Sequence, residues 1–232
     1  MRSSDLPEVR ELALFRTCAE DNFEELMQAA YLQTFPAQVE LVAAGDSADF
    51  LFVVIEGSVE LYGHARERES TLSIVEPVGS FILAAVVKDA AYLMSARTLA
   101  KSRLLMIPAE NVRAIFEKDE AFARAVVLEL ANCYRVMVKE LKNQKLRSSV
   151  ERLANRLLRL HAQQGSKGSV ELPFDKRTLA SLLGMTPENL SRAFNTLQPY
   201  GVTVNGSRIE LTSLADLETL ARPTPLIDDP TC

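Results

Sequence analysis

The sequence is poor in the residues on which metal centres and disulfides depend, and it holds no long apolar run. Only three of its 232 residues are cysteines and two are histidines. Cys18, Cys133 and Cys232 are far apart and odd in number, which fits neither a disulfide framework nor a metal-ligand spacing. No apolar run reaches the roughly 18 residues that a membrane-spanning helix needs. We therefore assign no metal site to the cysteines and expect no membrane partner, and the cysteine usage places the protein in the reducing cytoplasm.

The usual signatures of enzymes are missing as well. We find no Gly-rich phosphate loop and no Ser, Cys, His and Asp arrangement for nucleophilic catalysis. Residues 1–5 lead into a mixed polar segment, unlike a secretory signal. Hydrophobic residues make up 47% and charged residues 25% of the chain, which is the balance of a globular protein with room for two domains. The sequence therefore predicts a binding protein rather than an enzyme.

The charge is unevenly distributed along the chain. The net charge of −5 would by itself disfavour nucleic acid as a partner. Residues 147–211, however, hold nine Lys or Arg against five Asp or Glu, a local net charge of +4 that leaves −9 for the rest. A positive module attached to an acidic body can still be held on phosphates by its local field.

The first half of the chain changes from a helical to a β pattern. Apolar residues recur at helical spacing from about residue 6 to 31. Short β-type runs follow, separated by turn signals and by a polar stretch at 63–70, and they favour an antiparallel barrel or sandwich. The runs are Val39–Val42, Phe50–Ile55, Ser58–Tyr62, Thr71–Val75 and Arg103–Ile107.

A long helix is expected from about Glu120 to Lys145, and it carries two apolar stripes. The first consists of Val126, Leu130, Cys133 and Met137, and the second of Val127, Ala131, Tyr134, Val138 and Leu141. Spacings that alternate between four and three residues are typical of a coiled-coil seam. We predict that the first stripe is the seam of a homodimer and that the second faces the barrel. A helix buried inside one monomer is the alternative.

A helix-turn-helix is predicted over residues 175–197. Asp175 can cap a first short helix, and Gly184 stands where that helix must end in a left-handed conformation. Thr186 can cap a second helix, whose first turn contains Pro187. Asn-Gly between two β-type runs in the segment 202–211 predicts a hairpin, which would be the wing of a winged helix-turn-helix.

The outer face of the second helix has the chemistry that base reading needs. Glu188 can accept a hydrogen bond from a cytosine amino group, Arg192 can donate two to guanine, and Ser191 can touch a base edge. The alternative is a plain helical hairpin in which Glu188 and Arg192 form an ordinary surface pair. The residues expected to contact DNA phosphates are Lys176, Arg177, Thr186, Asn189 and Arg208.

The segments 45–59 and 186–192 resemble the superfamily of the cyclic-AMP receptor protein and the oxygen regulator FNR, and the likeness covers about residues 10–221. It implies an α+β chain: a cyclic-nucleotide-binding-like jelly roll, a long dimerisation helix and a C-terminal winged helix-turn-helix. It also implies a homodimer that binds double-stranded DNA and acts on RNA polymerase under the control of a small effector. The expected domains are 1–118 for the effector, 119–146 for dimerisation and 147–221 for DNA, with a disordered tail at 222–232.

Two finer likenesses concern the target and the signal. The Glu-x-x-Ser-Arg pattern at Glu188–Arg192 is similar to that of the FNR branch, which implies recognition of TTGAT…ATCAA palindromes. Residues 140–154 are similar to the nitric-oxide-responsive regulators of denitrification in that branch.

The departures from the superfamily bear on its cofactors. Cyclic-nucleotide binders hold ribose with a Gly-Glu pair where this chain has Leu83-Ala84, and hold phosphate with an Arg where it has Met94-Ser95. Arg97 is out of register, so cyclic AMP is not expected, because a desolvated phosphate needs a cation. Cys18 stands alone near the N-terminus, so an iron–sulfur cluster is not expected either.

The effector itself is left open. The apolar segment 83–94 beside the long helix could form a pocket from Leu83, Val87, Met94 and Tyr134, and the denitrification relatives suggest haem and nitric oxide. The candidate iron ligands are His64, Met94, Cys133 and Met137, whereas His161 is expected at the surface of the DNA-binding half. The alternatives are core packing without a cofactor, a regulator controlled only by its abundance, or a small-molecule-binding protein without a DNA function.

Overall fold

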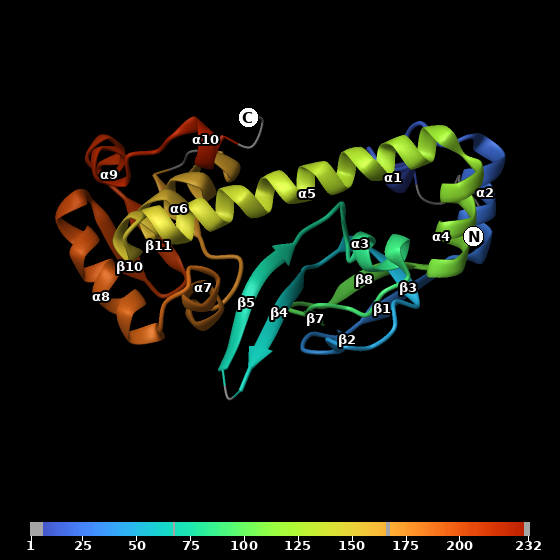
Figure 1. Ribbon diagram of the computed structural model, residues 1–232. Helices are drawn as coiled ribbons and strands as arrows, with labels where there is room; N and C mark the ends of the chain where they lie inside the picture. Colours follow the sequence, from blue (N-terminus) through green and yellow to red (C-terminus); the bar gives the residue numbers. More distant parts are fainter. Residues whose placement is uncertain (1–6, 67, 166–167, 230–232) are drawn as a thin grey trace. The chain divides into compact units, whose positions relative to one another are not determined.

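The computed structural model describes residues 7–66, 68–165 and 168–229 (Figure 1). The chain forms two compact units, which meet in sequence between Tyr134 and Arg135, inside the segment 119–146 that we expected to be a separate dimerisation region. Sheets and helices occur in both units, so the predicted α+β class is confirmed. The longest helix, α5 (Glu120–Leu146), crosses the division. Nowhere in the described residues is a helix long and apolar enough to span a membrane.

The N-terminal unit is a jelly roll of two four-stranded antiparallel sheets, in the orders β1-β8-β3-β6 and β2-β7-β4-β5. The predicted barrel or sandwich is therefore confirmed. The strands are β1 (Tyr31–Phe35), β2 (Glu40–Val42), β3 (Phe50–Glu56), β4 (Val59–Ala65), β5 (Arg68–Val75), β6 (Gly79–Phe81), β7 (Ser95–Thr98) and β8 (Ser102–Pro108). The accompanying helices are α1 (Pro7–Arg10), α2 (Glu20–Ala29), α3 (Leu83–Lys88) and α4 (Ala109–Lys118).

Two local expectations for this unit are wrong. The helical pattern over residues 6–31 is divided into α1 and α2, and it ends where Tyr31 begins β1. The polar stretch 63–70 is mostly strand, because β4 and β5 continue through it with His64 opposite Glu69. Its polar residues lie on exposed strand ends, where apolar alternation is not required.

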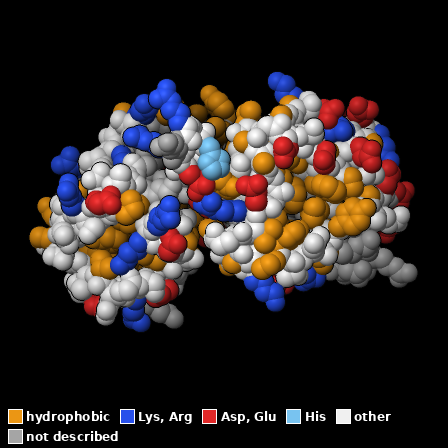
Figure 2. All heavy atoms as spheres, turned by 90° about the horizontal axis from the view of Figure 1, so that it is seen from below, with side chains coloured by type: hydrophobic (Ala, Val, Ile, Leu, Met, Phe, Trp, Pro, Cys, Tyr) orange, Lys and Arg blue, Asp and Glu red, His pale blue; other side chains and the backbone are white. Residues whose placement is uncertain are grey.

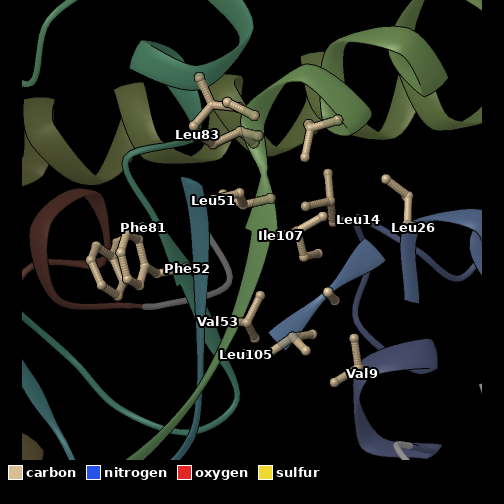
Figure 3. Close-up of a cluster of buried hydrophobic side chains, with 14 of the residues drawn as sticks. Val9, Leu14, Leu26, Leu51, Phe52, Val53, Phe81, Leu83, Leu105 and Ile107 are labelled. Atoms are coloured by element: carbon tan, nitrogen blue, oxygen red, sulfur yellow. The ribbon is translucent and has the colours of Figure 1, made fainter. Parts of the chain in front are cut away.

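Strand β3, inside the first sheet, is buried on both faces, which explains why it is an almost uninterrupted apolar run. On one face Phe52 of β3 stacks on Phe81 of β6, with ring centroids 5.2 Å apart. Figure 3 shows these rings on one side of the sheet and Ile107, with Leu14 and Leu26 of the N-terminal helical segment, on the other.

Asp119 joins the start of α5 to the N-terminal helices. Its carboxylate accepts hydrogen bonds from the backbone N–H of Phe122 at 2.9 Å and of Ala19 at 2.9 Å, from Asn22 Nδ2 at 2.8 Å and from Cys18 Sγ at 3.4 Å. Burial alone would raise the pKa of Asp119, but these hydrogen bonds hold it well below its usual range. Burial, and then the bond to Asp119, raise the pKa of the Cys18 thiol to about 12.

Replacing Asp119 by asparagine should destabilise this unit in a pH-dependent way. Losing the charge that these four hydrogen bonds stabilise should lower the free energy of unfolding by about 3 kcal/mol at pH 7. Because the folded-state pKa is depressed, this contribution is complete above the unfolded value of about 3.9 and is lost progressively as the pH falls from there through the folded-state pKa. In urea unfolding, the difference in stability between the variant and wild type should therefore be smaller at about pH 2 than at pH 7. The exposed Asp21→Asn variant is the control, and a gap independent of pH would contradict the assignment.

The C-terminal unit is a winged helix-turn-helix, as predicted. Its helices are α6 (Ser149–Gln163), α7 (Lys176–Leu182), α8 (Pro187–Leu197), α9 (Leu214–Ala221) and α10 (Pro225–Asp228), with a 3-10 turn at Gln198–Tyr200. Its strands β9 (Ser169–Glu171), β10 (Val202–Asn205) and β11 (Arg208–Leu211) form a small sheet in the order β10-β11-β9. Leu153, Leu179, Leu197 and Ile209 are fully buried in a core that joins α6, α7, α8 and the sheet.

Two expectations for this unit differ from the structure. The tail was expected to be disordered from residue 222, but residues 225–228 form α10, in which Ile227 is buried and Asp228 pairs with Arg147. Composition alone could not reveal this pairing, because its partner lies about eighty residues earlier in the chain. Residues 230–232 lie outside the described residues. His161 was expected at the surface, yet it is buried in α6.

Candidate DNA-binding site

The two helices of the candidate site are capped as the sequence predicts. The Asp175 carboxylate accepts a hydrogen bond from the Thr178 N–H at 2.7 Å and begins α7. The Thr186 hydroxyl accepts one from the Asn189 N–H at 3.3 Å and begins α8. Between them, Gly184 has a φ of +64°, and a Cβ there would lie 2.6 Å from Gln144 Oε1. The turn therefore favours glycine for its backbone angle, whereas the flexible Gln144 side chain could move away from a Cβ.

Helix α8 buries one face and exposes a polar one. Leu190, Phe194 and Leu197 pack in the core of the unit. The exposed positions of the opposite face are Glu188, Asn189, Ser191, Arg192 and Asn195. All three predicted base-reading residues are therefore exposed on one helix, near its N-terminus, where a helix that enters the major groove makes its base contacts.

Glu188 and Arg192 are chemically available for hydrogen bonds to bases. The hydrogen bond from the Thr186 hydroxyl, and after it the backbone N–H of Glu188 itself, lower the pKa of the Glu188 carboxyl. It is therefore an ionised acceptor at neutral pH. Among the ion pairs of the described residues, none within 4.0 Å joins Glu188 to Arg192, although the charge of Arg192 contributes to lowering the pKa of Glu188.

The predicted phosphate-contacting residues surround this helix. Lys176 and Arg177 are exposed at the start of α7, and Arg208 is exposed where β11 leaves the Asn205-Gly206 turn of the wing. A hollow of about 360 Å³ lies between α7, α8 and β10 and brings Lys176 and Arg177 together with Ser191. Thr186, Asn189 and Arg208 do not line it.

Two residues that line this hollow, Asn195 and Thr203, were given no contact with DNA from the sequence. Helical spacing places Asn195 on the outer face of α8, four residues after Ser191, but does not by itself give it a role. Thr203 carries no such signal, because only the fold of the wing brings β10 to the recognition helix. Figure 2 shows the surface from below, with many of the Lys and Arg side chains over the C-terminal unit and Asp and Glu side chains gathered on the N-terminal one.

The predicted effector pocket is not formed as expected. Leu83 is buried in the N-terminal core, and Val87 and Met94 pack against the same core. Tyr134 is instead 69% exposed on α5. Leu83, Val87 and Met94 thus contribute to the packing of the N-terminal unit, whereas Leu93 of the same segment is 90% exposed.

The candidate haem ligands do not fit a haem site. The His64 side chain is half exposed, with Nε2 3.8 Å from Glu69 Oε2, and Cys133 and Met137 are exposed on α5. Met94 remains, half-buried against the core. In the described part of the chain no group of three or more His, Cys, Asp or Glu side chains could hold a metal ion.

The place of a cyclic phosphate is also chemically unsuited. Ser95, where cyclic-nucleotide binders have a phosphate-binding region, accepts a hydrogen bond from the Ala44 N–H at 3.0 Å. The nearby guanidinium of Arg97 is held by Glu60, at 2.7 Å from Nε, and by both oxygens of Glu69. Because Arg97 is already neutralised by two carboxylates, it offers no free cation to a phosphate, which supports the expectation that cyclic AMP is not bound.

The apolar stripes of α5 are divided differently from the prediction. Val126 is fully buried in the N-terminal core and Leu130 packs against it, so the prediction of a seam through Val126 is wrong, while Cys133 and Met137 are exposed. The second stripe is exposed along its whole length, beside the exposed Cys133 and Met137 of the first. It consists of Val127 (59% exposed), Ala131, Tyr134 (69%), Val138 (38%) and Leu141 (58%). We call this set the α5 stripe.

Comparisons with known proteins agree with this architecture. Residues 32–119 match the cyclic nucleotide-binding domain family, and residues 151–220 match the Crp-like helix-turn-helix domain family. The chain is similar to a Silicibacter pomeroyi DSS-3 protein described as a candidate cAMP-binding regulatory protein, with 26% identity, a TM-score of 0.62 and coverage of 96% of this chain and 100% of that one. Curated protein sequences give no match.

Two further structures share the fold. FixK2 from Bradyrhizobium japonicum has 20% identity and a TM-score of 0.73, with coverage of 84% of this chain and 98% of FixK2. A candidate transcriptional regulator of the CRP/FNR family from Eubacterium rectale ATCC 33656 has 20% identity and a TM-score of 0.75, with coverage of 90% and 98%. Together, the two matches show a cyclic nucleotide-binding domain followed by a Crp-like helix-turn-helix domain, and the solved structures share this fold.

Proposed function

We propose that the protein is a homodimeric regulator that binds a palindromic DNA site with two copies of α8. The observation that carries the proposal is the exposed polar face of α8, on which Glu188, Ser191 and Arg192 stand in a capped and winged helix-turn-helix. Each copy would read one half of a TTGAT…ATCAA site, the sequence implied by the likeness to the FNR branch. Lys176, Arg177, Thr186, Asn189 and Arg208 would hold the flanking phosphates.

Dimerisation through the α5 stripe is supported by its exposure and by its spacing. Apolar side chains at alternating intervals of four and three residues need a second helix to cover them, and the stripe is left exposed by the described residues of the single chain. A twofold dimer would present two α8 helices to half-sites one turn of DNA apart. Bound in this way, the dimer would recruit or block RNA polymerase in the cytoplasm.

The region before α5 would be the effector domain and the unit from residue 147 the DNA-binding domain. A small effector that changes the packing of α5 would reposition the two α8 helices. Nitric oxide sensed through haem remains a prediction from the likeness to the denitrification regulators, and the positions of His64 and Cys133 do not favour it. A regulator controlled only by its abundance is the alternative.

DNA binding is tested by fluorescence anisotropy with purified protein at fixed salt. We expect a duplex with the TTGAT…ATCAA palindrome to bind at least 10³-fold more tightly than a scrambled duplex of equal composition. Equal affinity for both duplexes would refute sequence-specific recognition of this palindrome. Absence of binding to either would favour the small-molecule-binding alternative.

The effector is tested by haem titration of the oxygen-free protein, followed by absorbance. Saturation near one haem per monomer, with a spectrum that changes on addition of nitric oxide, would support the gas-sensing hypothesis. A spectrum that stays that of free haem would reject it.

A further inference from the structure

The C-terminal tail, residues 222–229, folds across the junction between α5 and α6. Arg147 follows α5 directly, and Ser148 is the N-cap of α6. The carboxylate of Asp228 in α10 accepts hydrogen bonds from both terminal nitrogens of Arg147, at 2.8 and 2.5 Å. Only 7% of the Arg147 side chain and 19% of the Asp228 side chain are exposed. The pair is therefore bidentate and mostly removed from water.

The tail contacts the helices on both sides of the junction. From α5, Lys139 Nζ donates to the backbone oxygen of Asp229 at 2.7 Å and Lys142 Nζ to that of Leu226 at 3.5 Å. From α6, an Arg159 guanidinium nitrogen lies 3.9 Å from an Asp228 oxygen. Through these contacts the tail connects the last turns of α5 to α6.

The same junction is tied to the helix-turn-helix by a second set of contacts. Arg152 of α6 donates from Nε to the Leu183 backbone oxygen at 2.9 Å and from Nη1 to the Arg147 backbone oxygen at 2.8 Å. Gly184 lies against Gln144 of α5. The end of α5 is thus held by the turn between α7 and α8 and also by the tail, so its orientation sets that of α8.

The chemistry of the pair makes its loss consequential. Burial opposes ionisation of Asp228, but the hydrogen bonds from Arg147 and from the Thr224 N–H outweigh it and lower its pKa. The carboxylate is therefore charged at neutral pH. Removing it leaves the buried Arg147 guanidinium without a carboxylate partner, and only the hydrogen bond from Nη1 to Asn143 Oδ1 at 3.3 Å remains to its side chain. Such a loss is more disruptive than the loss of an exposed ion pair.

We propose that the tail is a positioning element: by pairing Asp228 with Arg147 it fixes the end of α5 to the DNA-binding unit, and simultaneous binding of both half-sites depends on it. The inference rests on the proposed function. A dimer gains affinity for a palindrome because, once one α8 is bound, the other is held at the correct distance. The second α8 is thereby present at a high effective concentration near its half-site. If the junction is loosened, this effective concentration falls, although the residues that contact bases are unchanged.

The test compares wild type with Asp228→Ala on two duplexes, one with the full palindrome and one with a single half-site. We expect affinity for the palindrome to fall at least tenfold, affinity for the half-site to stay within twofold, and the protein to remain dimeric by sedimentation. Amide hydrogen exchange over residues 139–147 should become at least tenfold faster. The matched control is Glu218→Ala, which removes an exposed carboxylate from α9 and should match wild type. The exchanged pair Arg147→Asp with Asp228→Arg should restore palindrome binding to within threefold.

Two results would overturn the proposal. One is an Asp228→Ala protein that binds the palindrome within twofold of wild type. The other is an equal loss on both duplexes, which would mean that the recognition surface itself is damaged. If wild type binds neither duplex, the proposed function is wrong. Hydrogen exchange then tests separately whether the tail holds the junction between α5 and α6. Equal exchange rates over residues 139–147 in wild type and Asp228→Ala would show that the tail does not hold the junction.

Discussion

Glutamate in place of Leu141 should leave the protein monomeric and without high affinity for a palindrome. Leu141 is 58% exposed in the single chain and belongs to the α5 stripe with Tyr134 and Val138. Across a twofold axis the substitution removes two apolar side chains, each worth about 1.5–3 kcal/mol when fully buried, and places two carboxylates near each other. We expect the dimer dissociation constant to rise at least 100-fold in sedimentation equilibrium, and palindrome affinity to fall to that of a half-site.

The matched control is Val136→Glu, the same kind of change at an apolar residue of α5 that is 63% exposed. Val136 is two residues from Val138, about 200° around the helix, so it points away from the α5 stripe. It should remain dimeric and bind the palindrome like wild type. Dissociation of Val136→Glu with a stable Leu141→Glu dimer would place the dimer interface on the opposite side of α5.

The helix-turn-helix could be predicted because its signals are local. Asp175, Gly184 and Thr186 act within four residues of their own positions, as N-caps or as a left-handed turn, and each does so in the structure. The apolar face of α8 follows from helical periodicity in the same way. Where neighbouring residues dictate the conformation, the exposed face that remains is also determined, and the predicted base-reading residues lie on it.

Which apolar stripe of α5 is covered by the jelly roll could not be predicted from spacing alone. Two stripes of α5 satisfy the same alternation, and they differ only in what the rest of the chain places against them. The jelly roll covers Val126 and Leu130, which leaves Tyr134 and Leu141 exposed. The periodicity of apolar residues indicates how many faces of a helix are apolar. Which part of the protein packs against each face depends on the tertiary structure.

The prediction of a disordered tail was wrong for a related reason. Its prolines and aspartates have the composition of a disordered segment, and only the distant Arg147 gives Asp228 a reason to be ordered. His161 was misplaced because a single polar residue gives no sign of its burial; it lies on the buried face of α6 with Leu157 and Leu160.

Replacing Arg192 by alanine should remove sequence discrimination more than it removes DNA binding. Arg192 is exposed on α8, so the change should leave folding intact. A bidentate contact to guanine contributes about 1–3 kcal/mol at each half-site, so affinity for the palindrome should fall roughly 5- to 150-fold for each half-site. Affinity for the scrambled duplex, which rests on phosphate contacts, should change little. In anisotropy titrations the ratio of the affinity for the palindrome to that for the scrambled duplex should therefore fall by the same factor.

The partner base is identified by combining the protein change with a change in the DNA. If Arg192 contacts the guanine of TTGAT, wild type should lose affinity when that base pair is replaced, and Arg192→Ala should lose little more, because the interaction is already gone. Full additivity of the two losses would mean that Arg192 does not contact that guanine.

Lys176→Ala should differ from Arg192→Ala in its effect on DNA affinity, because Lys176 is expected to contact a phosphate and Arg192 a base. Lys176 is exposed at the first position of α7 and lines the hollow beside Ser191. Its removal should weaken both duplexes by the same factor and lower the slope of log affinity against log salt by about one for each phosphate that Lys176 neutralises. Arg192→Ala should instead change the ratio of the affinities for the two duplexes, with a smaller change in the salt slope. The two variants should therefore differ in which of these two measurements they change. If instead Arg192→Ala weakened both duplexes equally and lowered the salt slope, α8 would be held on the DNA backbone by Arg192, and base reading would have to be assigned to Glu188 and Ser191 alone.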